Sequence, residues 1–296
     1  MNPEALAEPY LRGRAAAAAI AAASARLARA GIASARLDAE LLMAAALGVS
    51  RTAIIGGTPP LDATALRRFE QMVERRATRE PLAYIIGRRE FFSLEFAVLP
   101  GVLIPRPETE TVVDVALDFL RGRPNATVLD IGTGSGAIAI AIAKNAPAAR
   151  VVASDISKVS LEMAAGNARR HRCGDRITFV EGNCFAELDE NGSPFDLIVS
   201  NPPYIVEAEL ATLAPEIRDF EPRLALDGGH DGLEFYRKIA HGLARWLAAD
   251  GEVVLEVGAG QAAAVETMMR LAGYDRSERI PDLAGIERVV RSRRSR

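Results

Sequence analysis

Cysteine is scarce in this chain of 296 residues, and so are histidine and the aromatic residues. The sequence has two cysteines, Cys173 and Cys184, three histidines and a single tryptophan. None of the histidines stands at metal-ligand spacing from either cysteine, so we expect neither a disulfide framework nor a zinc or other metal site. Such sparing use of cysteine is typical of a reducing compartment, which favours the cytoplasm.

The chain also lacks a surplus of positive charge and a long hydrophobic run. Its 36 Lys and Arg residues stand against 39 Asp and Glu residues, a net charge of −3. No global positive field therefore points to a nucleic-acid partner. No stretch reaches the roughly 18 apolar residues that a membrane span needs. We expect a monomer that binds no nucleic acid stably and touches no membrane.

One alanine run needs a separate argument, because it follows two arginines near the N-terminus. Residues 15–23 are alanine with one isoleucine, and Arg12 and Arg14 precede them. Glu4 and Glu8 lie in what would be the basic part of an export signal, which argues against that interpretation. Alanine is the best helix former but only weakly hydrophobic, so the run predicts a helix.

What the sequence does contain is a glycine-rich turn between a short apolar strand and a helix. The strand covers residues 128–131 and the helix-forming stretch covers 137–145. Between them stand Gly132, Thr133, Gly134, Ser135 and Gly136. A second apolar run, 150–154, ends at Asp155. A carboxylate at the end of the second strand is placed to accept hydrogen bonds from ribose hydroxyls, so the pattern predicts a nucleoside cofactor.

The glycines alone leave two cofactors open. The spacing Gly132-x-Gly134-x-x-Ala137 also satisfies the dinucleotide fingerprint, so a nicotinamide-dependent oxidoreductase is an alternative. Asp130, two residues before the first glycine, would crowd a pyrophosphate but could pair with the ammonium group of an amino acid. S-adenosylmethionine carries an ammonium group and no phosphate, which favours the methyl donor.

A second motif stands at the end of a buried strand. Residues 195–200 are apolar and β-branched, as in a core strand of a parallel sheet, and Asn201-Pro202-Pro203-Tyr204 follow. Prolines cannot donate ladder hydrogen bonds, so the backbone leaves the sheet there. Ligands of open α/β sheets bind at the carboxyl ends of strands. The stiff loop is suited to holding a planar amide or amino group.

The two motifs together resemble the class I methyltransferases that act on planar nitrogens, a group that includes adenine-N6 and protein-glutamine-N5 enzymes. Four flanking segments narrow the resemblance to the peptide-chain release factor glutamine methyltransferases, the HemK/PrmC family. These segments are residues 80–87, 102–110, 220–229 and 231–236. The resemblance therefore covers the chain from residue 80 to about residue 236.

This resemblance implies an α/β fold, a class I S-adenosylmethionine-dependent methyltransferase with a Rossmann-like, mostly parallel sheet and one antiparallel strand. It assigns the cofactor to Asp130, to residues 132–136 and Asp155, and to Asn183 and Cys184 after the third strand. The family usually has an acid and a bulky aromatic residue at those last two positions. Asn183 accepts through an uncharged amide oxygen and Cys184 offers less apolar surface to adenine, so we expect a weaker hold on the cofactor.

Three parts follow along the chain. Residues 1–86 read as a helical bundle, with Leu66, Phe69, Met72 and Val73 on one face of an amphipathic helix; in the resembled family this part helps to recognise the release factor. Residues 87–107 are expected to form a β-hairpin linker that turns at Pro100-Gly101, and 108–296 the methyltransferase domain. The last four arginines, from Arg291 onwards, are expected to form a solvated basic tail.

The mechanism expected from these residues centres on the loop at Asn201. Its side chain and the Pro202 carbonyl would accept hydrogen bonds from the NH2 group of a glutamine, against which Tyr204 would pack. The Asn201 NH2 group would also reach the aminoacyl end of the cofactor. Two alternatives stay open at this point: an adenine-N6 nucleic-acid methyltransferase, which uses the same kind of loop, and a non-catalytic module that docks on the translation machinery.

Overall fold

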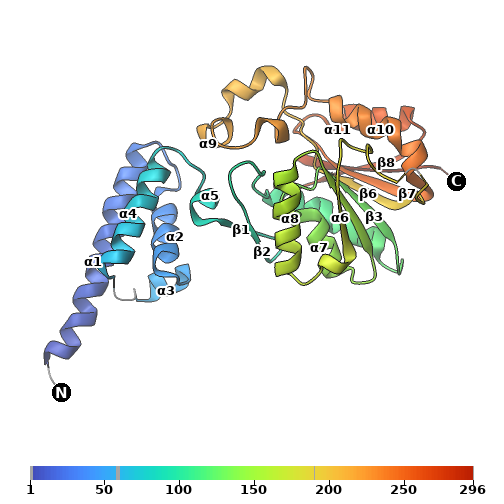
Figure 1. The fold of residues 1–296 in the computed structure, drawn as a ribbon. Helices are drawn as coiled ribbons and strands as arrows, with labels where there is room; N and C mark the ends of the chain where they lie inside the picture. The colour runs from blue at the N-terminus through green and yellow to red at the C-terminus, as the bar shows by residue number, and fades with distance from the viewer. Residues whose placement is uncertain (1–2, 58–60, 190, 296) are drawn as a thin grey trace. The chain divides into compact units, whose positions relative to one another are not determined.

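Contacts divide the chain into two compact units in the computed structural model, which describes residues 3–57, 61–189 and 191–295 (Figure 1). The first unit, here called the helical unit, joins Met1–Gly87 to a distant segment, Pro215–Phe220. The second, called the catalytic unit, consists of Arg88–Ala214 and Glu221–Arg296. A short piece of the second half of the chain thus belongs with the N-terminal helices.

The helical unit is built from α1 (Pro3–Arg29), α2 (Ala35–Leu47), α3 (Arg51–Gly56), α4 (Ala63–Ala77) and α5 (Leu82–Ile86). Phe69, Met72 and Val73 of α4 are buried in its core, as the helical spacing predicts. The Asp62 side chain accepts hydrogen bonds from the backbone N–H groups of Thr64 and Ala65 and so caps the start of α4. Across the described residues, no helix has both the length and the apolar character to cross a membrane.

Ion pairs fasten the distant segment to the helical unit. Its short helix α9 (Pro215–Arg218) carries Glu216, which accepts from Arg76 Nη2 at 3.0 Å and from Arg79 Nη2 at 2.7 Å. Arg76 is itself buried and donates from Nε to Asp38 Oδ2 at 2.8 Å. A buried carboxylate is tolerated when it is paired and hydrogen-bonded in this way.

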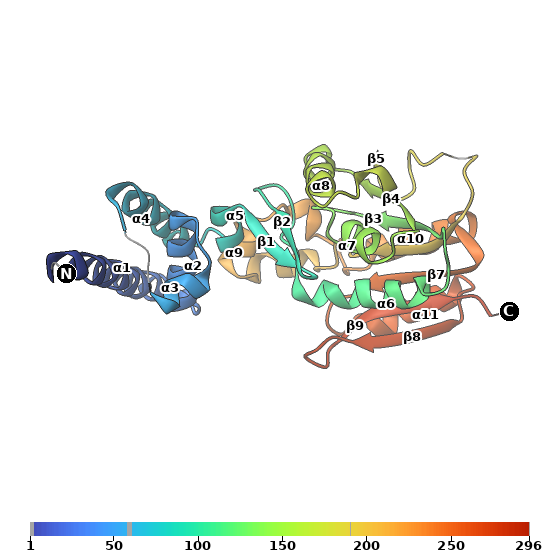
Figure 2. The same cartoon turned by 90° about the horizontal axis from the view of Figure 1, so that it is seen from below.

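The catalytic unit contains a sheet of seven strands in the order β5-β4-β3-β6-β7-β9-β8. Figure 2 shows this sheet with β5 at one edge and β8 at the other. The strands are β3 (Thr127–Ile131), β4 (Arg150–Asp155), β5 (Ile177–Glu181), β6 (Phe195–Ser200), β7 (Leu247–Glu256), β8 (Arg276–Pro281) and β9 (Glu287–Arg293). β9 runs antiparallel to both of its neighbours and all other pairings in this sheet are parallel. The predicted sheet with one antiparallel strand is confirmed.

Helices cover both faces of the sheet (Figure 1). One face packs against α6 (Glu110–Leu120), α7 (Ala137–Asn145) and α8 (Lys158–Arg170), the other against α10 (Glu234–Trp246) and α11 (Ala262–Leu271). Because side chains alternate along a strand, Val128 of β3 faces the first group and Leu129 the second. The 3-10 turns are η1 (Pro107–Thr109), η2 (Gly174–Arg176), η3 (Glu207–Thr212) and η4 (Arg223–Ala225).

A hairpin is present within residues 87–107, but its strands and its turn differ from those predicted. β1 (Arg88–Phe91) pairs with β2 (Leu94–Ala97), and the chain reverses at Phe92 and Ser93, not at Pro100-Gly101. Both turn residues adopt positive φ, 50° and 58°. Glu110 holds this turn by accepting from the Phe92 N–H at 2.8 Å. The returning strand expected at 102–104 does not form, and the Ile104 N–H is instead donated to the Glu221 side chain.

The C-terminal arginines are the other correction. Arg291 and Arg293 lie in β9, and both donate to the carboxylate of Glu252, which is buried in β7. Arg294 lies over the ring of Tyr274. These contacts replace the solvated tail that the arginine spacing suggested; Arg296 lies outside the described residues. The expected pair of last strands also proves to be three, because β8 precedes β9.

Candidate functional site

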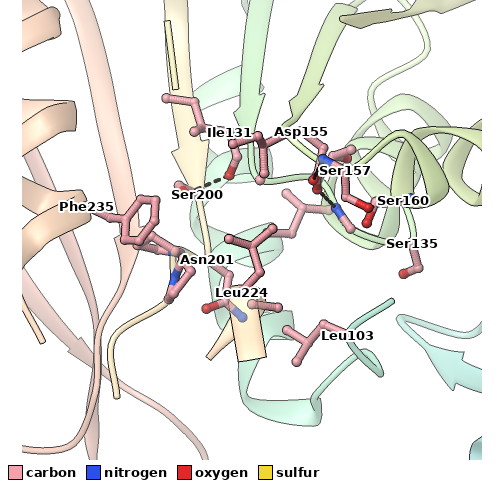
Figure 3. A pocket seen from close by; sticks show the side chains of 18 of the residues that line it. Leu103, Ile131, Ser135, Asp155, Ser157, Ser160, Ser200, Asn201, Leu224 and Phe235 are labelled. Atoms are coloured by element: carbon pink, nitrogen blue, oxygen red, sulfur yellow. Dashed lines mark hydrogen bonds between the residues drawn. The ribbon is translucent and has the colours of Figure 1, made fainter. Parts of the chain in front are cut away.

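A cavity of about 360 Å³ opens at the carboxyl ends of β3, β4 and β6, within the catalytic unit (Figure 3). The sequence-predicted residues that line it are Gly132, Thr133, Gly134, Ser135, Asp155, Asn183, Cys184, Asn201, Pro202 and Pro203. Three further predicted residues, Asp130, Gly136 and Tyr204, do not line it. The fold therefore brings the glycine-rich turn and the Asn201 loop to one cavity, although about seventy residues separate them in the sequence.

The glycine-rich turn uses its own amide groups. Gly132 and Thr133 both donate to the carbonyl oxygen of Ser154, at 2.8 and 2.9 Å, and Gly136 donates to that of Thr133. The Gly134 N–H donates to Asp155 Oδ2 at 2.8 Å. A dinucleotide site needs such amides free for a pyrophosphate. Their engagement inside the chain favours a cofactor without phosphate.

Asp155 connects the ends of two strands and the start of a helix. Beyond its bond to the glycine-rich turn, its Oδ1 accepts from the Ser157 N–H at 2.8 Å, just before α8. Burial raises the pKa of the Asp155 carboxyl, and these backbone hydrogen bonds oppose the rise. Each carboxylate oxygen has a second lone pair. Asp155 is thus fixed in place and still able to accept from ribose hydroxyls.

Asp130 lies behind the turn and is completely buried. Its Oδ2 accepts from Thr133 Oγ1 at 2.7 Å and from the Ala139 N–H at 3.2 Å. Its Oδ1 has no hydrogen-bond partner within the described part of the chain. Burial raises the pKa of this carboxyl to about 7. A buried acid with an unsatisfied oxygen is a group that gains from a nearby cation, as the ammonium of S-adenosylmethionine would be.

Gly136 serves packing rather than the cavity. A Cβ at this position would lie 2.8 Å from Ile140 Cδ1 and 3.1 Å from Ala164 Cβ, and the residue has a φ of +84°. Any larger residue would force α7 and α8 apart. The third glycine of the motif is therefore required for close helix packing, which is the role such a position has in related α/β turns.

The segment after β5 presents Asn183 and Cys184 to the cavity. Asn183 is exposed, whereas Cys184 is buried, and burial raises the pKa of its thiol. The next residue, Phe185, turns away and stacks on Trp246 of α10, with ring centroids 6.2 Å apart. The aromatic residue of this segment is partly buried, packs against the core and does not line the cavity.

The Asn201 loop is fixed from behind by residues that sequence reasoning did not single out. Asn201 Nδ2 donates to Thr109 Oγ1 at 3.0 Å, and Thr109 Oγ1 donates to Glu256 Oε2 at 2.5 Å. The Tyr204 hydroxyl donates to Glu256 Oε1 at 3.4 Å. Tyr204 thus points to this carboxylate, and burial with the negative charge of Glu256 raises the pKa of its phenol to about 12.

Backbone pairing holds the rest of the loop. The Ile205 N–H donates to Leu226 O at 3.0 Å, and the Gly228 N–H donates to Ile205 O at 2.8 Å. A Cβ on Gly228 would lie 2.7 Å from the Cα of Tyr204, so only glycine allows this approach. The segment 220–229, part of the family resemblance, is therefore a structural partner of the Asn201 loop.

Two other missed residues hold the cavity walls. Arg106 lines the cavity and donates from Nη2 to Glu221 Oε1 at 2.5 Å. Asn167, buried in α8, donates to the carbonyl oxygens of Ala97 and Ser135 and so joins the hairpin to the glycine-rich turn. Arg106 stood inside a motif noted in the sequence, but Asn167 carried no signal, because its partners are 70 and 32 residues away.

The two ends of the cavity differ in chemistry. In Figure 3, Asp155, Ser157 and Ser160 gather at one side, and Asn201 and Phe235 lie at the other. Apolar side chains from Leu103, Ile131 and Leu224 also line it. A polar end that accepts from hydroxyls, an apolar wall and a fixed amide fit S-adenosylmethionine together with a planar nitrogen substrate.

Two family models match the chain. Residues 18–87 match the PrmC N-terminal domain, and residues 99–219 match the methyltransferase small domain. The first match lies in the helical unit. The second contains the glycine-rich turn, Asp155 and the Asn201 loop.

Curated relatives align with nearly the whole chain. A release factor glutamine methyltransferase of Geobacter sulfurreducens is 46% identical over 90% of this chain and 92% of its own length. One of Burkholderia pseudomallei is 46% identical over 86% of this chain and 90% of its own. One of Moorella thermoacetica is 43% identical over 89% and 93%.

Solved structures share the fold at low identity. The catalytic domain of hMettl16, solved in complex with a 3′UTR hairpin, aligns with a TM-score of 0.58 at 16% identity, over 76% of this chain and 82% of that one. A methyltransferase from Pyrococcus furiosus gives a TM-score of 0.51 at 19% identity, over 74% and 97%. At these identities the likeness shows a methyltransferase fold and nothing finer.

Proposed function

The chain belongs to the release factor glutamine methyltransferase family, and from that premise we propose that it methylates class 1 peptide-chain release factors. The methyl group passes from S-adenosylmethionine to the side-chain amide nitrogen, N5, of the glutamine in the Gly-Gly-Gln motif. The enzyme is thus a protein-glutamine methyltransferase that acts on the translation-termination machinery. We place this activity in the cytoplasm and expect the protein to act as a monomer.

The observation that supports this function best is the fixed amide of Asn201 at the cavity. Its NH2 end is bonded to Thr109, so its oxygen is the end available to a substrate NH2 group. That oxygen and the Pro202 carbonyl would accept both hydrogens of the glutamine amide and fix its plane. Pro203 stiffens the loop. The Tyr204 hydroxyl is bonded to Glu256, so Tyr204 would contribute to glutamine binding by holding the loop in its conformation.

An amide nitrogen is a poor nucleophile, because its lone pair is delocalised into the carbonyl group. S-adenosylmethionine, when bound, supplies a methyl group already activated by its sulfonium. The task of the chain is to hold the glutamine nitrogen in line and to exclude water, and such positioning contributes on the order of 7–11 kcal/mol. Acceptors at Asn201 and Pro202 also stabilise positive charge as it forms on the nitrogen. The proton leaves after transfer, since an N-methylated, protonated amide is strongly acidic.

The residues for the cofactor divide by chemistry. Asp155 would accept from the ribose hydroxyls, and Asn183 and Cys184 would flank the adenine. The glycine-rich turn from Gly132 to Ser135 would let the cofactor lie close to the backbone. Asp130, one layer deeper, would act on the aminoacyl end through its charge.

We assign recognition of the release factor to the N-terminal helical bundle, residues 1–86, with the hairpin of 87–107 as the linker and 108–296 as the methyltransferase domain. The match of residues 18–87 to the N-terminal domain model of this family supports the assignment. A direct test is binding of the release factor to the full chain after charge reversal at exposed arginines of α4, such as Arg67 and Arg68.

Methyl transfer from labelled S-adenosylmethionine tests the function. The acceptors are purified release factor, its Gly-Gly-Ala variant, duplex DNA and single-stranded RNA. Label on the factor that vanishes with the Gln→Ala change is the expected result. The Asn201→Ala enzyme serves as the control, and we expect its turnover to fall by about 10²–10³-fold, the effect of losing one preorganised group at a reacting centre.

The same assay separates the alternatives. Label on the nucleic acid would move the function to adenine methylation, which the same loop chemistry allows. Binding of S-adenosylmethionine without label on any acceptor would favour a module that docks on the translation machinery.

A further inference from the structure

Behind the Asn201 loop runs a short chain of hydrogen bonds that ends on one buried acid. Glu256, the last residue of β7, is 1% exposed, and Thr109, at the end of η1, is 4% exposed. The order of donors is Asn201 Nδ2 to Thr109 Oγ1, and Thr109 Oγ1 to Glu256 Oε2. Neither Thr109 nor Glu256 takes part in the chemistry proposed above.

The direction of this chain follows from the chemistry of its last member. An ionised carboxylate only accepts hydrogen bonds, so the Thr109 hydroxyl must donate its one proton to Glu256. The Thr109 oxygen then accepts, and the group of Asn201 that can donate to it is the NH2 end. The two ends of an asparagine amide have nearly the same shape, so shape alone would not choose between the two orientations. The carboxylate therefore selects one.

The second oxygen of Glu256 acts on the other end of the loop. Its Oε1 accepts from the Tyr204 hydroxyl at 3.4 Å. Glu256 is itself fixed, because its backbone carbonyl accepts from the Tyr236 hydroxyl at 2.9 Å. The first and the last residue of Asn201-Pro202-Pro203-Tyr204 thus depend on a single carboxylate.

We propose that Thr109 and Glu256 are positioning residues for the methyl transfer, and that they act by keeping the Asn201 amide oxygen turned to the substrate amide. The proposal rests on the function proposed above. Reversal of the Asn201 amide would present two N–H donors to the glutamine NH2 group, a donor against a donor. The reaction would then lose the contact that orients its nucleophile.

The protonation of Glu256 supplies a readout that simple packing would not. Burial raises the pKa of this carboxyl to about 7, which the Thr109 hydrogen bond and the charge of Arg288 oppose and the charge of Glu108 reinforces. The remaining titratable neighbours are Tyr204 and Tyr236, whose own pKa values lie above the working range. Below pH 7 the protonated Glu256 can donate a hydrogen bond to Thr109, so the orientation of the Asn201 amide is no longer fixed. Turnover should therefore decrease as the pH is lowered below 7.

The test uses the full chain with saturating S-adenosylmethionine. Thr109→Val removes the hydroxyl at constant shape, Thr109→Ser keeps it, and Thr111→Val makes the same change two residues away. We expect Thr109→Val to lower kcat on the release factor about 10–100-fold, the usual cost of losing a group that orients a reacting residue. KM and cofactor affinity should stay within about twofold of the wild type, the range in which orientation alone has been lost. Thr109→Ser should recover most of the rate, and Thr111→Val should behave as wild type.

A second readout needs no turnover. The side-chain NH2 signal of Asn201, assigned by its loss in Asn201→Ala, should be protected from solvent exchange in the wild type and unprotected in Thr109→Val. If the wild type methylates no release factor but this protection behaves as expected, the substrate proposal fails and the positioning proposal stands. Wild-type kcat in Thr109→Val, or a loss that serine does not restore and that follows the melting temperature, would overturn the positioning proposal.

Glu256→Gln carries the test if Thr109→Val fails to fold. Glutamine keeps the volume and one acceptor but cannot titrate, so its kcat should be lower and should no longer depend on pH between about 5.5 and 7, the range around the raised pKa. The matched control is Glu252→Gln, a buried acid on the same strand that is paired with two arginines. That variant should lose stability and keep the wild-type pH profile. A wild-type acid limb in Glu256→Gln would contradict the proposal.

Discussion

Among the described residues, the buried acids of the helical unit are all paired with arginines, whereas two of those in the catalytic unit are not. In the helical unit Asp38 is bonded to Arg76, and Glu40 to both Arg36 and Arg51. Hydrogen bonds from Arg36 and Arg51 hold the pKa of Glu40 below its usual value, although burial opposes them. In the catalytic unit Asp130 and Glu256 are bonded to hydroxyl and amide groups, without a cation, and burial raises both pKa values to about 7.

The difference separates structural charge from functional charge. The other buried acids of the catalytic unit, Glu221, Glu252 and Asp282, do have arginine partners. Within the described residues, the two buried acids without an ion-pair partner are Asp130, next to the glycine-rich turn, and Glu256, behind the Asn201 loop. An enzyme that leaves a buried acid without a cation gives up stability, and perturbed acids of this kind cluster at functional sites.

The largest effect should come from breaking a paired charge. Arg76→Met would leave Asp38 and Glu216 buried or half-buried without their common partner, and should lower the free energy of unfolding by about 3–5 kcal/mol. Urea unfolding measures it. Arg88→Met is the control, since its pair with Glu95 is exposed and should change stability by only about 0–1 kcal/mol. Equal losses in both variants would remove the distinction between buried and exposed pairs.

Asp130→Asn should raise the free energy of unfolding, in contrast to Arg76→Met. Because the folded pKa lies about 3 units above that of an unfolded aspartate, removal of the charge should stabilise the cofactor-free protein by about 2–4 kcal/mol at pH 8. S-adenosylmethionine should bind more weakly, as calorimetry would measure. The matched change Asp38→Asn removes a paired charge and should destabilise the helical unit. A loss of stability in Asp130→Asn would contradict the account of this acid as an uncompensated charge.

The pH dependence of that gain follows from the same raised pKa. The folded protein holds the Asp130 proton up to about pH 7, whereas an unfolded aspartate loses it near pH 3.8. This proton's contribution to stability is therefore complete below about pH 3.8 and is lost as pH rises to about 7, at up to about 1.4 kcal/mol per pH unit. The stability difference between Asp130→Asn and wild type should grow between pH 4 and 7 and then level off. A constant difference would contradict the shift.

The smallest effect, on cofactor affinity, is expected when an acid is introduced at an exposed position. Asn183→Asp places a charged acceptor at the cavity, and charge-assisted hydrogen bonds are stronger than neutral ones, so S-adenosylmethionine should bind about 2–5-fold tighter. Isothermal calorimetry at fixed ionic strength measures it, and Asn191→Asp adds the same charge elsewhere on the surface. No change, or the same change in both variants, would show that the amide already serves the adenine as well as an acid does.

The sequence was informative where its signals were local. The helix at 137–145, the glycine-rich turn and the loop after β6 each follow from neighbouring residues, and the structure places them as expected. The turn at Phe92 and Ser93 was missed because neither residue is typical of positive φ; a contact from Glu110 holds it. β8 was missed because most of its residues are polar and exposed.

The hydrogen-bond chain behind Asn201 lay beyond local reasoning. Thr109 and Glu256 are 147 residues apart, and each stands in a segment that reads as ordinary helix start or core strand. One signal was present: Glu256 is an acid at the end of the apolar run that begins at Val253. A charge in a core strand requires a partner, but the sequence does not show which.

The membership of Pro215–Phe220 in the helical unit makes this enzyme hard to take apart. The chain passes from one unit to the other after Gly87, after Ala214 and after Phe220. A shortened gene whose product began at residue 88 would therefore encode α9 without Arg76 and Arg79, the cationic partners of Glu216. A recombination that exchanges N-terminal modules between two such genes would need a matching pair at Glu216 as well. The helical unit is consequently inherited together with a piece of the enzyme's second half, and its evolution is bound to that piece.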